Sequence, residues 1–222
     1  MTSGVSTLGK RTARRAWLPE WCRLLYLDYR RYRVAGRGLP ETLLLTQGLW
    51  ASAVYRICHA LVESMPSGPL HWTAKTLASL PQKLMEILTG ICLPRDCEIG
   101  GGLYLPSFGA IILARGSIGA NCTIEQNVTL GVAGRGAERG VPTLGERVFI
   151  GAGAVIVGKV TIGDDAYIFP GSVVTRSVPA RAVVMGYPAR IVSYDGSFEL
   201  IAYDGMDDDP QRRAALDQPN NN

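Results

Sequence analysis

The sequence comprises 222 residues, of which 47% are hydrophobic and 19% are charged, and its formal net charge is +4. This globular composition excludes a wholly disordered chain. So small a charge gives no reason to expect a nucleic acid as partner. The length suits one ordinary domain with a smaller one attached.

Positive charge is concentrated at the start of the chain. The first 40 residues hold nine Lys and Arg against two acidic residues, a net charge of +7. We interpret residues 1–16 as a basic flexible N-terminus. Aromatic residues that include Trp17 and Trp21 follow it. Such a mixture also occurs at membrane surfaces, although a solvated helix face is the interpretation that we favour.

Residues 17–90 show helical spacing of their apolar side chains and predict a helical N-terminal domain of three or four helices. The most apolar stretch, residues 43–62, contains Arg56 and His59, which argues against a membrane-spanning helix. Pro40 and the stretch 65–69, which is rich in proline and glycine, are expected to separate the helices, because proline lacks an amide donor.

The pattern changes completely after Gly90. Aliphatic residues then recur every six positions, with one step of seven and one interruption, which neither a helix nor an isolated strand explains. Short strands joined by turns give this period when successive coils stack their aliphatic side chains in one interior. The sequence therefore predicts an α+β protein in which residues 91–192 form a left-handed parallel β-helix of hexapeptide repeats. The stacked positions are Leu93, Ile99, Leu105, Ile111, Ile118, Ile124, Leu130, Leu144, Ile150, Ile156, Ile162, Ile168 and Val174.

A longer loop interrupts the repeats. The step from Leu130 to Leu144 is 14 residues, so residues 131–143 are expected to leave the coil, and their four glycines allow close approach to a ligand. A flat-sided prism has to bury one side, so we expect a homotrimer or a dimer of trimers with sites between subunits. Residues 193–222 are expected to form a C-terminal acidic tail that is loose from residue 204 onward.

The five cysteines include no C-x-x-C pair and indicate neither a disulfide framework nor a zinc knuckle. A reducing compartment is the natural setting for such a chain. We therefore expect a cytoplasmic protein.

Four motifs carry a resemblance to a known family. They are TGICLPRDCEIG at 89–100, NVTLG at 127–131, PTLGERVFIGAGA at 142–154 and GYPARIV at 186–192. Together with the helical first half, they resemble serine O-acetyltransferase over roughly residues 20–192. The resemblance implies a helical domain followed by a left-handed β-helix. It also implies acetyl transfer from acetyl-CoA to a hydroxyl, in a groove between two subunits.

The chain departs from that family at the catalytic positions. The family's general-base histidine falls on Ser107 or Pro106, depending on the direction of counting, and the aspartate that orients it falls on Cys92. A second histidine is expected after Arg139, which is present, but the next residues are glycine and valine. A serine hydroxyl cannot accept a proton at neutral pH, so the family's mechanism cannot run here as written.

The framework for coenzyme A is retained by the same resemblance. Small residues would admit the pantetheine arm, and a cation would meet the phosphates. No metal is expected, because the β-helix holds no histidine and three would be needed for zinc. The implied cofactor-binding residues are Gly131, Gly151, Ala152, Gly153, Ala154, Gly171, Ser172 and Arg190.

Several functions stay open at this point. In the first, the protein is an acetyltransferase whose acceptor is an amine, or one in which another side chain, such as Glu125, accepts the proton. A solvated surface carboxylate is, however, the more common role for a residue such as Glu125. Cys92 could serve as a covalent relay if a cation such as Arg95 lowered its pKa, but a structural thiol is more common. The alternatives are a CoA-binding pseudoenzyme, a scaffold, and an O-acetyltransferase of polysaccharides. Serine acetyltransferases that bind cysteine synthase do so through a C-terminal tail that ends in isoleucine. The present sequence ends in asparagine, so the resemblance does not extend to such a complex and none is expected.

Overall fold

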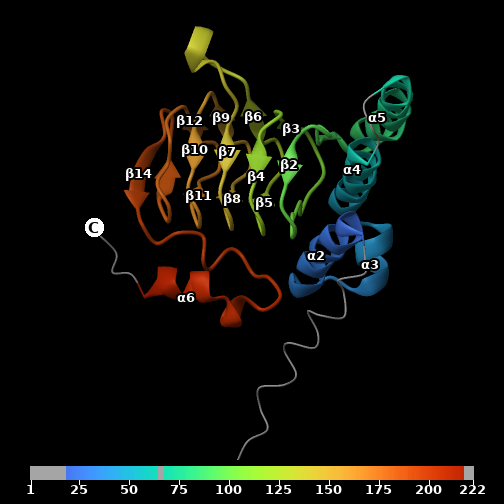
Figure 1. The fold of residues 1–222 in the computed structure, drawn as a ribbon. Coiled ribbons are helices and arrows are strands. Elements are labelled where there is room, and N and C mark those ends of the chain that lie inside the picture. Colours follow the sequence, from blue (N-terminus) through green and yellow to red (C-terminus); the bar gives the residue numbers. More distant parts are fainter. Residues whose placement is uncertain (1–18, 65–67, 218–222) are drawn as a thin grey trace, which may run out of the picture.

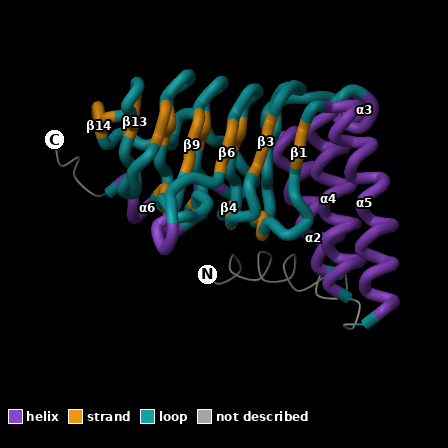
Figure 2. The backbone as a smooth tube through the Cα atoms, turned by 90° about the horizontal axis from the view of Figure 1, so that it is seen from above, coloured by secondary structure: helices purple, strands orange, loops and turns teal. Residues whose placement is uncertain are grey.

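The structure is a computed structural model and describes residues 19–64 and 68–217 (Figure 1). The helices of the N-terminal half gather at one end of the molecule, and a row of β-coils extends from them (Figures 1 and 2). The predicted α+β class is therefore confirmed. The predicted basic N-terminus, residues 1–16, lies outside the described residues.

In the described part of the helical domain, residues 19–64 and 68–90, four helices are present: α2 (Glu20–Val34), α3 (Leu39–Leu44), α4 (Gln47–Glu63) and α5 (Pro69–Thr89). The chain breaks between α2 and α3 as expected near Pro40, which itself lies in the first turn of α3, where no amide donor is required. Pro69 begins α5 for the same reason. Gly90, with φ 70°, ends α5 in the left-handed conformation, which glycine adopts at little cost. No helix within the described ranges has the length and hydropathy needed to cross a bilayer.

Residues 91–185 form the coils of the β-helix, and their parallel strands build three sheets. Sheet A has the order β1-β3-β6-β9-β12, sheet B the order β10-β7-β4-β2, and sheet C the order β14-β13-β11-β8-β5, in which β14 is antiparallel to β13. The strands are β1 (Ile91–Cys92), β2 (Glu98–Ile99), β3 (Ile111–Leu113), β4 (Ser117–Ile118), β5 (Thr123–Ile124), β6 (Thr129–Gly131), β7 (Thr143–Leu144), β8 (Phe149–Ile150), β9 (Val155–Val157), β10 (Thr161–Ile162), β11 (Tyr167–Ile168), β12 (Val173–Val174), β13 (Val183–Met185) and β14 (Arg190–Ser193).

The interior of the prism holds the aliphatic residues that the repeat predicts, and all thirteen are buried. One stacking partner differs from the prediction. Leu113, rather than Ile111, pairs with Leu130, and Ile111 pairs with Ile91 one step earlier. The reason is the turn at 106–110, which adds residues ahead of β3. The expected steps of six and seven between Leu105 and Ile118 are therefore replaced by one of eight, to Leu113, and one of five.

A buried ion pair fastens the helical domain to the first coil. Asp28 of α2 accepts hydrogen bonds from Arg56 Nε at 3.1 Å and from the backbone N–H groups of Gly102 and Leu103, both at 2.9 Å. Ser52 of α4 also donates to Asp28. Arg56 donates in turn to carbonyls of the first coil. Because Asp28 is fully buried and Arg56 is 2% exposed, this network fixes α2, α4 and the coil in one arrangement.

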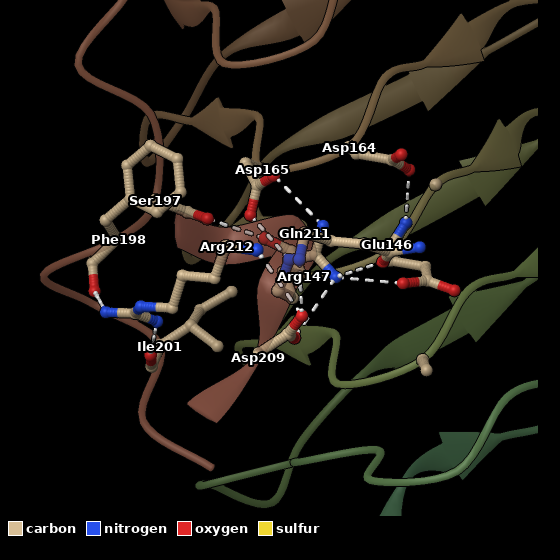
Figure 3. Close-up of polar contacts among 12 residues, drawn as sticks. Glu146, Arg147, Asp164, Asp165, Ser197, Phe198, Ile201, Asp209, Gln211 and Arg212 are labelled. Atoms are coloured by element: carbon tan, nitrogen blue, oxygen red, sulfur yellow. Dashed lines mark hydrogen bonds and ion pairs between the residues drawn. The ribbon is translucent and has the colours of Figure 1, made fainter. Parts of the chain in front are cut away.

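The acidic tail is not loose within its described part, so that expectation is wrong. After β14 the chain runs back beneath the strands to α2 (Figure 1), where Arg31 donates to Ala202 O at 2.7 Å. Asp209 caps α6 (Pro210–Leu216) and lies 3.8 Å from Arg147, which also pairs with buried Asp165 at 2.7 Å (Figure 3). Residues 218–222 lie outside the described part.

Candidate functional site

The turns that lead from sheet C to sheet A form one edge of the prism, called here the C–A edge. Gly153 N donates to Gln126 O at 2.9 Å, and Gly171 N donates to Ala152 O at 2.8 Å, so the turns of successive coils stack directly. Ser107 lies in the corresponding turn of the first coil. The structure thus brings Ser107, Glu125 and the small residues at 151–154 and 171–172 to the same edge.

Glu125 is fixed on this edge. Its neighbour Ile124 points into the core, so Glu125 points outward, and its Oε2 accepts a hydrogen bond from Ala152 N at 2.8 Å. The expectation of a freely solvated carboxylate is therefore wrong. Its charge also reaches Tyr167, whose pKa is raised by burial and, to a smaller extent, by Glu125.

The small residues of the edge divide into two groups. Gly153 and Gly171 have φ near +70°, and a Cβ added to either would have no atom closer than 4.0 Å, so they leave open space along the edge. A Cβ on Gly151 would lie 2.6 Å from Pro170, so this glycine is required for stacking. Ala154 and Ser172 are buried, and Ser172 Oγ accepts from Gly186 N at 3.2 Å. Their side chains therefore support the edge from inside.

Arg190 lies beside the last coil of this edge. It begins β14, directly after Ala189, whose backbone N–H donates to Val173 O at 3.0 Å. Its side chain is exposed. A cation is thus available at the end of the edge opposite to Ser107.

Gly131 and Arg139 lie on a different edge, between sheets A and B. The loop 131–143 projects from the prism there (Figure 1), closed by backbone hydrogen bonds between Ala133 and Gly140 of 3.2 and 3.0 Å. Arg139 is exposed at the end of a short 3₁₀ helix, Gly136–Glu138. A single chain therefore does not bring these two residues to Ser107 and Glu125.

Cys92 has surroundings unsuited to a relay. Burial raises the pKa of its half-buried thiol, and Glu86 raises it further. Arg95 is engaged elsewhere, because it donates to Lys75 O at 2.7 Å and to Ser79 Oγ at 2.8 Å. A raised pKa leaves little thiolate at neutral pH, so the structure gives the relay hypothesis no support.

The two histidines belong to α4 and α5 of the helical domain. His59 Nδ1 lies 2.6 Å from Arg95 O, and its Nε2 lies 3.4 Å from Glu63. Within the described ranges, no group of three or more His, Cys, Asp or Glu residues is placed to hold a metal ion.

A cavity of about 460 Å³ opens at the first coil, between the C–A edge and the helical domain. Its wall includes Ser107, Phe108 and Gln126 from the β-helix and Arg37 and Thr46 from the helical domain. Sequence reasoning did not single out Arg37, Thr46 or Gln126. No periodic signal marks them, because they meet only through the packing of the helices on the first coil.

Comparisons with known proteins identify the fold and the family. Residues 142–176 match the family model described as "Bacterial transferase hexapeptide (six repeats)". A serine acetyltransferase of Helicobacter pylori is 34% identical over 169 residues, which cover 73% of this chain and 94% of that protein.

Two solved structures are also similar. Serine acetyltransferase from Brucella abortus, in complex with coenzyme A, has a TM-score of 0.67 at 27% identity and covers 82% of this chain and 71% of its own. The Neisseria gonorrhoeae serine acetyltransferase in complex with serine has a TM-score of 0.64 at 29% identity, and the match covers 82% of this chain and 72% of that chain. The chain belongs to the serine acetyltransferase family of hexapeptide-repeat proteins.

Proposed function

We propose that the protein is an acetyl-CoA-dependent O-acetyltransferase of the serine acetyltransferase type. Its acceptor is serine or a related small hydroxyl or amine compound. The main support is the C–A edge, which combines an outward carboxylate, open glycines and a terminal cation along successive coils. Relatives of the same family that hold coenzyme A or serine provide the reaction class.

Acetyl-CoA is proposed to lie along this edge. Coils are about 4.8 Å apart, so the distance from the turn of Ser107 to that of Gly171 is three coils, or about 14 Å. Gly153 and Gly171 leave room for the extended pantetheine arm, and Arg190 lies at the end of the edge where the phosphates of coenzyme A would be placed. The thioester is then placed towards the first coil, beside the cavity.

Glu125 is proposed as the proton acceptor in place of the family's histidine. The acceptor oxygen forms a bond with the thioester carbonyl carbon, its proton passes to the Glu125 carboxylate, and the C–S bond breaks to release the CoA thiolate, which takes up a proton. The Ala152 N–H bond holds the carboxylate in one orientation. A positioned general base contributes about 10²–10⁴-fold to such a step.

The complete site is proposed to form between the subunits of a trimer. The C–A edge and the edge that carries Gly131 and Arg139 lie on either side of sheet A. The outward residues of that sheet include several apolar ones, among them Ile112, which is 51% exposed, and Val155. Burial of this face against a second copy would bring the loop of one chain towards the C–A edge of another.

The test is thiol release from acetyl-CoA with L-serine and with a matched amine acceptor. The Glu125→Gln variant is compared with Glu98→Gln, a change of an exposed carboxylate in sheet B. We expect Glu125→Gln to lower kcat for serine by about 100-fold and to affect the amine less, because an amine already carries a free electron pair. Equal rates for wild type and Glu125→Gln would exclude Glu125 as the base.

A further inference from the structure

The cavity at the first coil contains a cation without a counter-ion. Arg37 is half-buried in its wall, and within the described chain it forms no ion pair with a carboxylate. Two buried arginines elsewhere do have a carboxylate partner: Arg56 pairs with Asp28, and Arg147 pairs with Asp165. A half-buried charge is costly unless it is paired, so a cation that borders a cavity in this state favours an anionic ligand.

The guanidinium of Arg37 is also held in place. Its Nη2 donates to Pro106 O at 2.8 Å and its Nη1 donates to Thr46 Oγ1 at 3.2 Å. The ring of Tyr32 lies 6.0 Å away and adds a cation–π contact. A guanidinium has more N–H donors than these two bonds use, so donors remain for an oxyanion in the fork geometry that suits a carboxylate.

The other walls indicate what else the ligand carries. Gln126 and Ser107 supply polar groups that pair with hydroxyl or amine groups, and Phe108, which is 68% exposed, supplies an apolar wall. A volume of about 460 Å³ lies in the usual range for small-molecule sites. The cavity thus suits a small polar organic anion.

The cavity adjoins the C–A edge directly, because Ser107 and Gln126 belong to both. We propose that it is the acceptor pocket and that Arg37 binds a carboxylate of the acceptor. The pocket therefore selects hydroxy compounds that carry a carboxylate over neutral alcohols. This inference rests on the proposed function, and it assigns a specificity role to a residue of the helical domain.

The test measures binding rather than turnover. Calorimetric titrations compare L-serine with 2-amino-1,3-propanediol, which replaces the carboxylate by a neutral alcohol, in the presence of coenzyme A. Arg37→Gln removes the positive charge, whereas Arg37→Lys keeps the charge but lacks the paired N–H donors of the guanidinium. Arg115→Gln is the control, because Arg115 is 74% exposed and outside the cavity. Inorganic phosphate serves as a second anion.

We expect Arg37→Gln to weaken serine binding by about 10- to 100-fold, Arg37→Lys by less, and Arg115→Gln to leave it unchanged. Binding of the neutral analogue should change by less than about threefold. Equal losses for both ligands would show that Arg37 only supports the turn at Pro106 and would overturn the inference. So would the absence of serine binding to the wild type, or binding of phosphate alone.

The two proposals fail separately. If Arg37→Gln abolishes the preference for the carboxylate but no acetyl transfer occurs, the proposed function fails, and only the role of Arg37 in binding a carboxylate stands. If serine is acetylated and Arg37→Gln keeps the full preference, only the pocket assignment fails.

Discussion

Replacement of Asp28 by alanine tests how the helical domain is attached to the β-helix. The substitution leaves Arg56, which is 2% exposed, without its carboxylate, and it leaves the backbone N–H groups of Gly102 and Leu103 without their acceptor. Removal of one partner of a buried ion pair costs about 3–5 kcal/mol. We therefore expect the free energy of unfolding to fall by about that amount.

The same loss should be visible as a change in melting temperature. For a chain of this length, 1 kcal/mol corresponds to about 2–4 °C, so Asp28→Ala should lower Tm by about 6–20 °C. Denaturant titration followed by circular dichroism measures the free energy directly. The control is Glu20→Ala in the same helix, because the Glu20–Arg23 pair is exposed and should contribute less than about 1 kcal/mol.

A double variant separates charge burial from loss of packing. Asp28→Leu combined with Arg56→Met removes both charges and should recover part of the stability that Asp28→Ala loses. A loss of less than about 1 kcal/mol in Asp28→Ala would refute the reasoning. Such a result would mean that the pair does not fasten the helices to the first coil.

Three further predictions concern the subunit interface, the thiol and the tail. Ile112→Lys should dissociate the proposed trimer in light-scattering measurements, whereas Thr161→Lys on sheet B should not, and a monomeric wild type would contradict this. Cys92→Ala should change the acetyl-transfer rate by less than about twofold, and a loss above about 100-fold would instead support a covalent relay. Burial tends to raise the pKa of Asp209, but hydrogen bonds from Tyr203, Gln211 and Arg212 and the charge of Arg147 outweigh it and lower the pKa. Because the folded pKa is depressed, the contribution of Asp209 to stability should be present above about pH 4 and lost as the pH falls further. The difference in Tm between wild type and Asp209→Asn should therefore shrink as the pH falls below about 4, and a difference that stays constant over that range would contradict it.

The coils could be predicted because their period is local. Each repeat places one aliphatic residue inward, so spacing alone identifies the buried positions, and all thirteen are buried. The period failed only where Ile111 and Leu113 are both aliphatic and both buried. There the register depends on how the turn at 106–110 folds against the end of α5. Gly109 N donates to Thr89 O at 3.2 Å, and Ile111 N donates to Gly90 O at 3.1 Å. The six-residue repeat does not predict these hydrogen bonds.

The tail and the cavity depend on contacts between distant segments. Composition predicts that the run of aspartates in the tail is solvated. In the structure, however, Asp209 lies 3.8 Å from the guanidinium of Arg147, which is only 3% exposed, and this charge holds Asp209 against the β-helix. Arg37 likewise counts only as one basic residue in a charged segment until α2 packs on the first coil. The outward position of Glu125 could be predicted from its neighbour Ile124, but its bond to the next coil could not.

The most direct test of the central claim is product formation. Purified protein is incubated with acetyl-CoA carrying a labelled acetyl group and with L-serine, and mass spectrometry follows the labelled acetyl group, with protein-free and serine-free controls. We predict acetylated serine that accumulates beyond one equivalent per chain and depends on both substrates. Protein that binds coenzyme A but yields no acetylated serine, amine or hydroxy acid would contradict the assignment as an acetyltransferase.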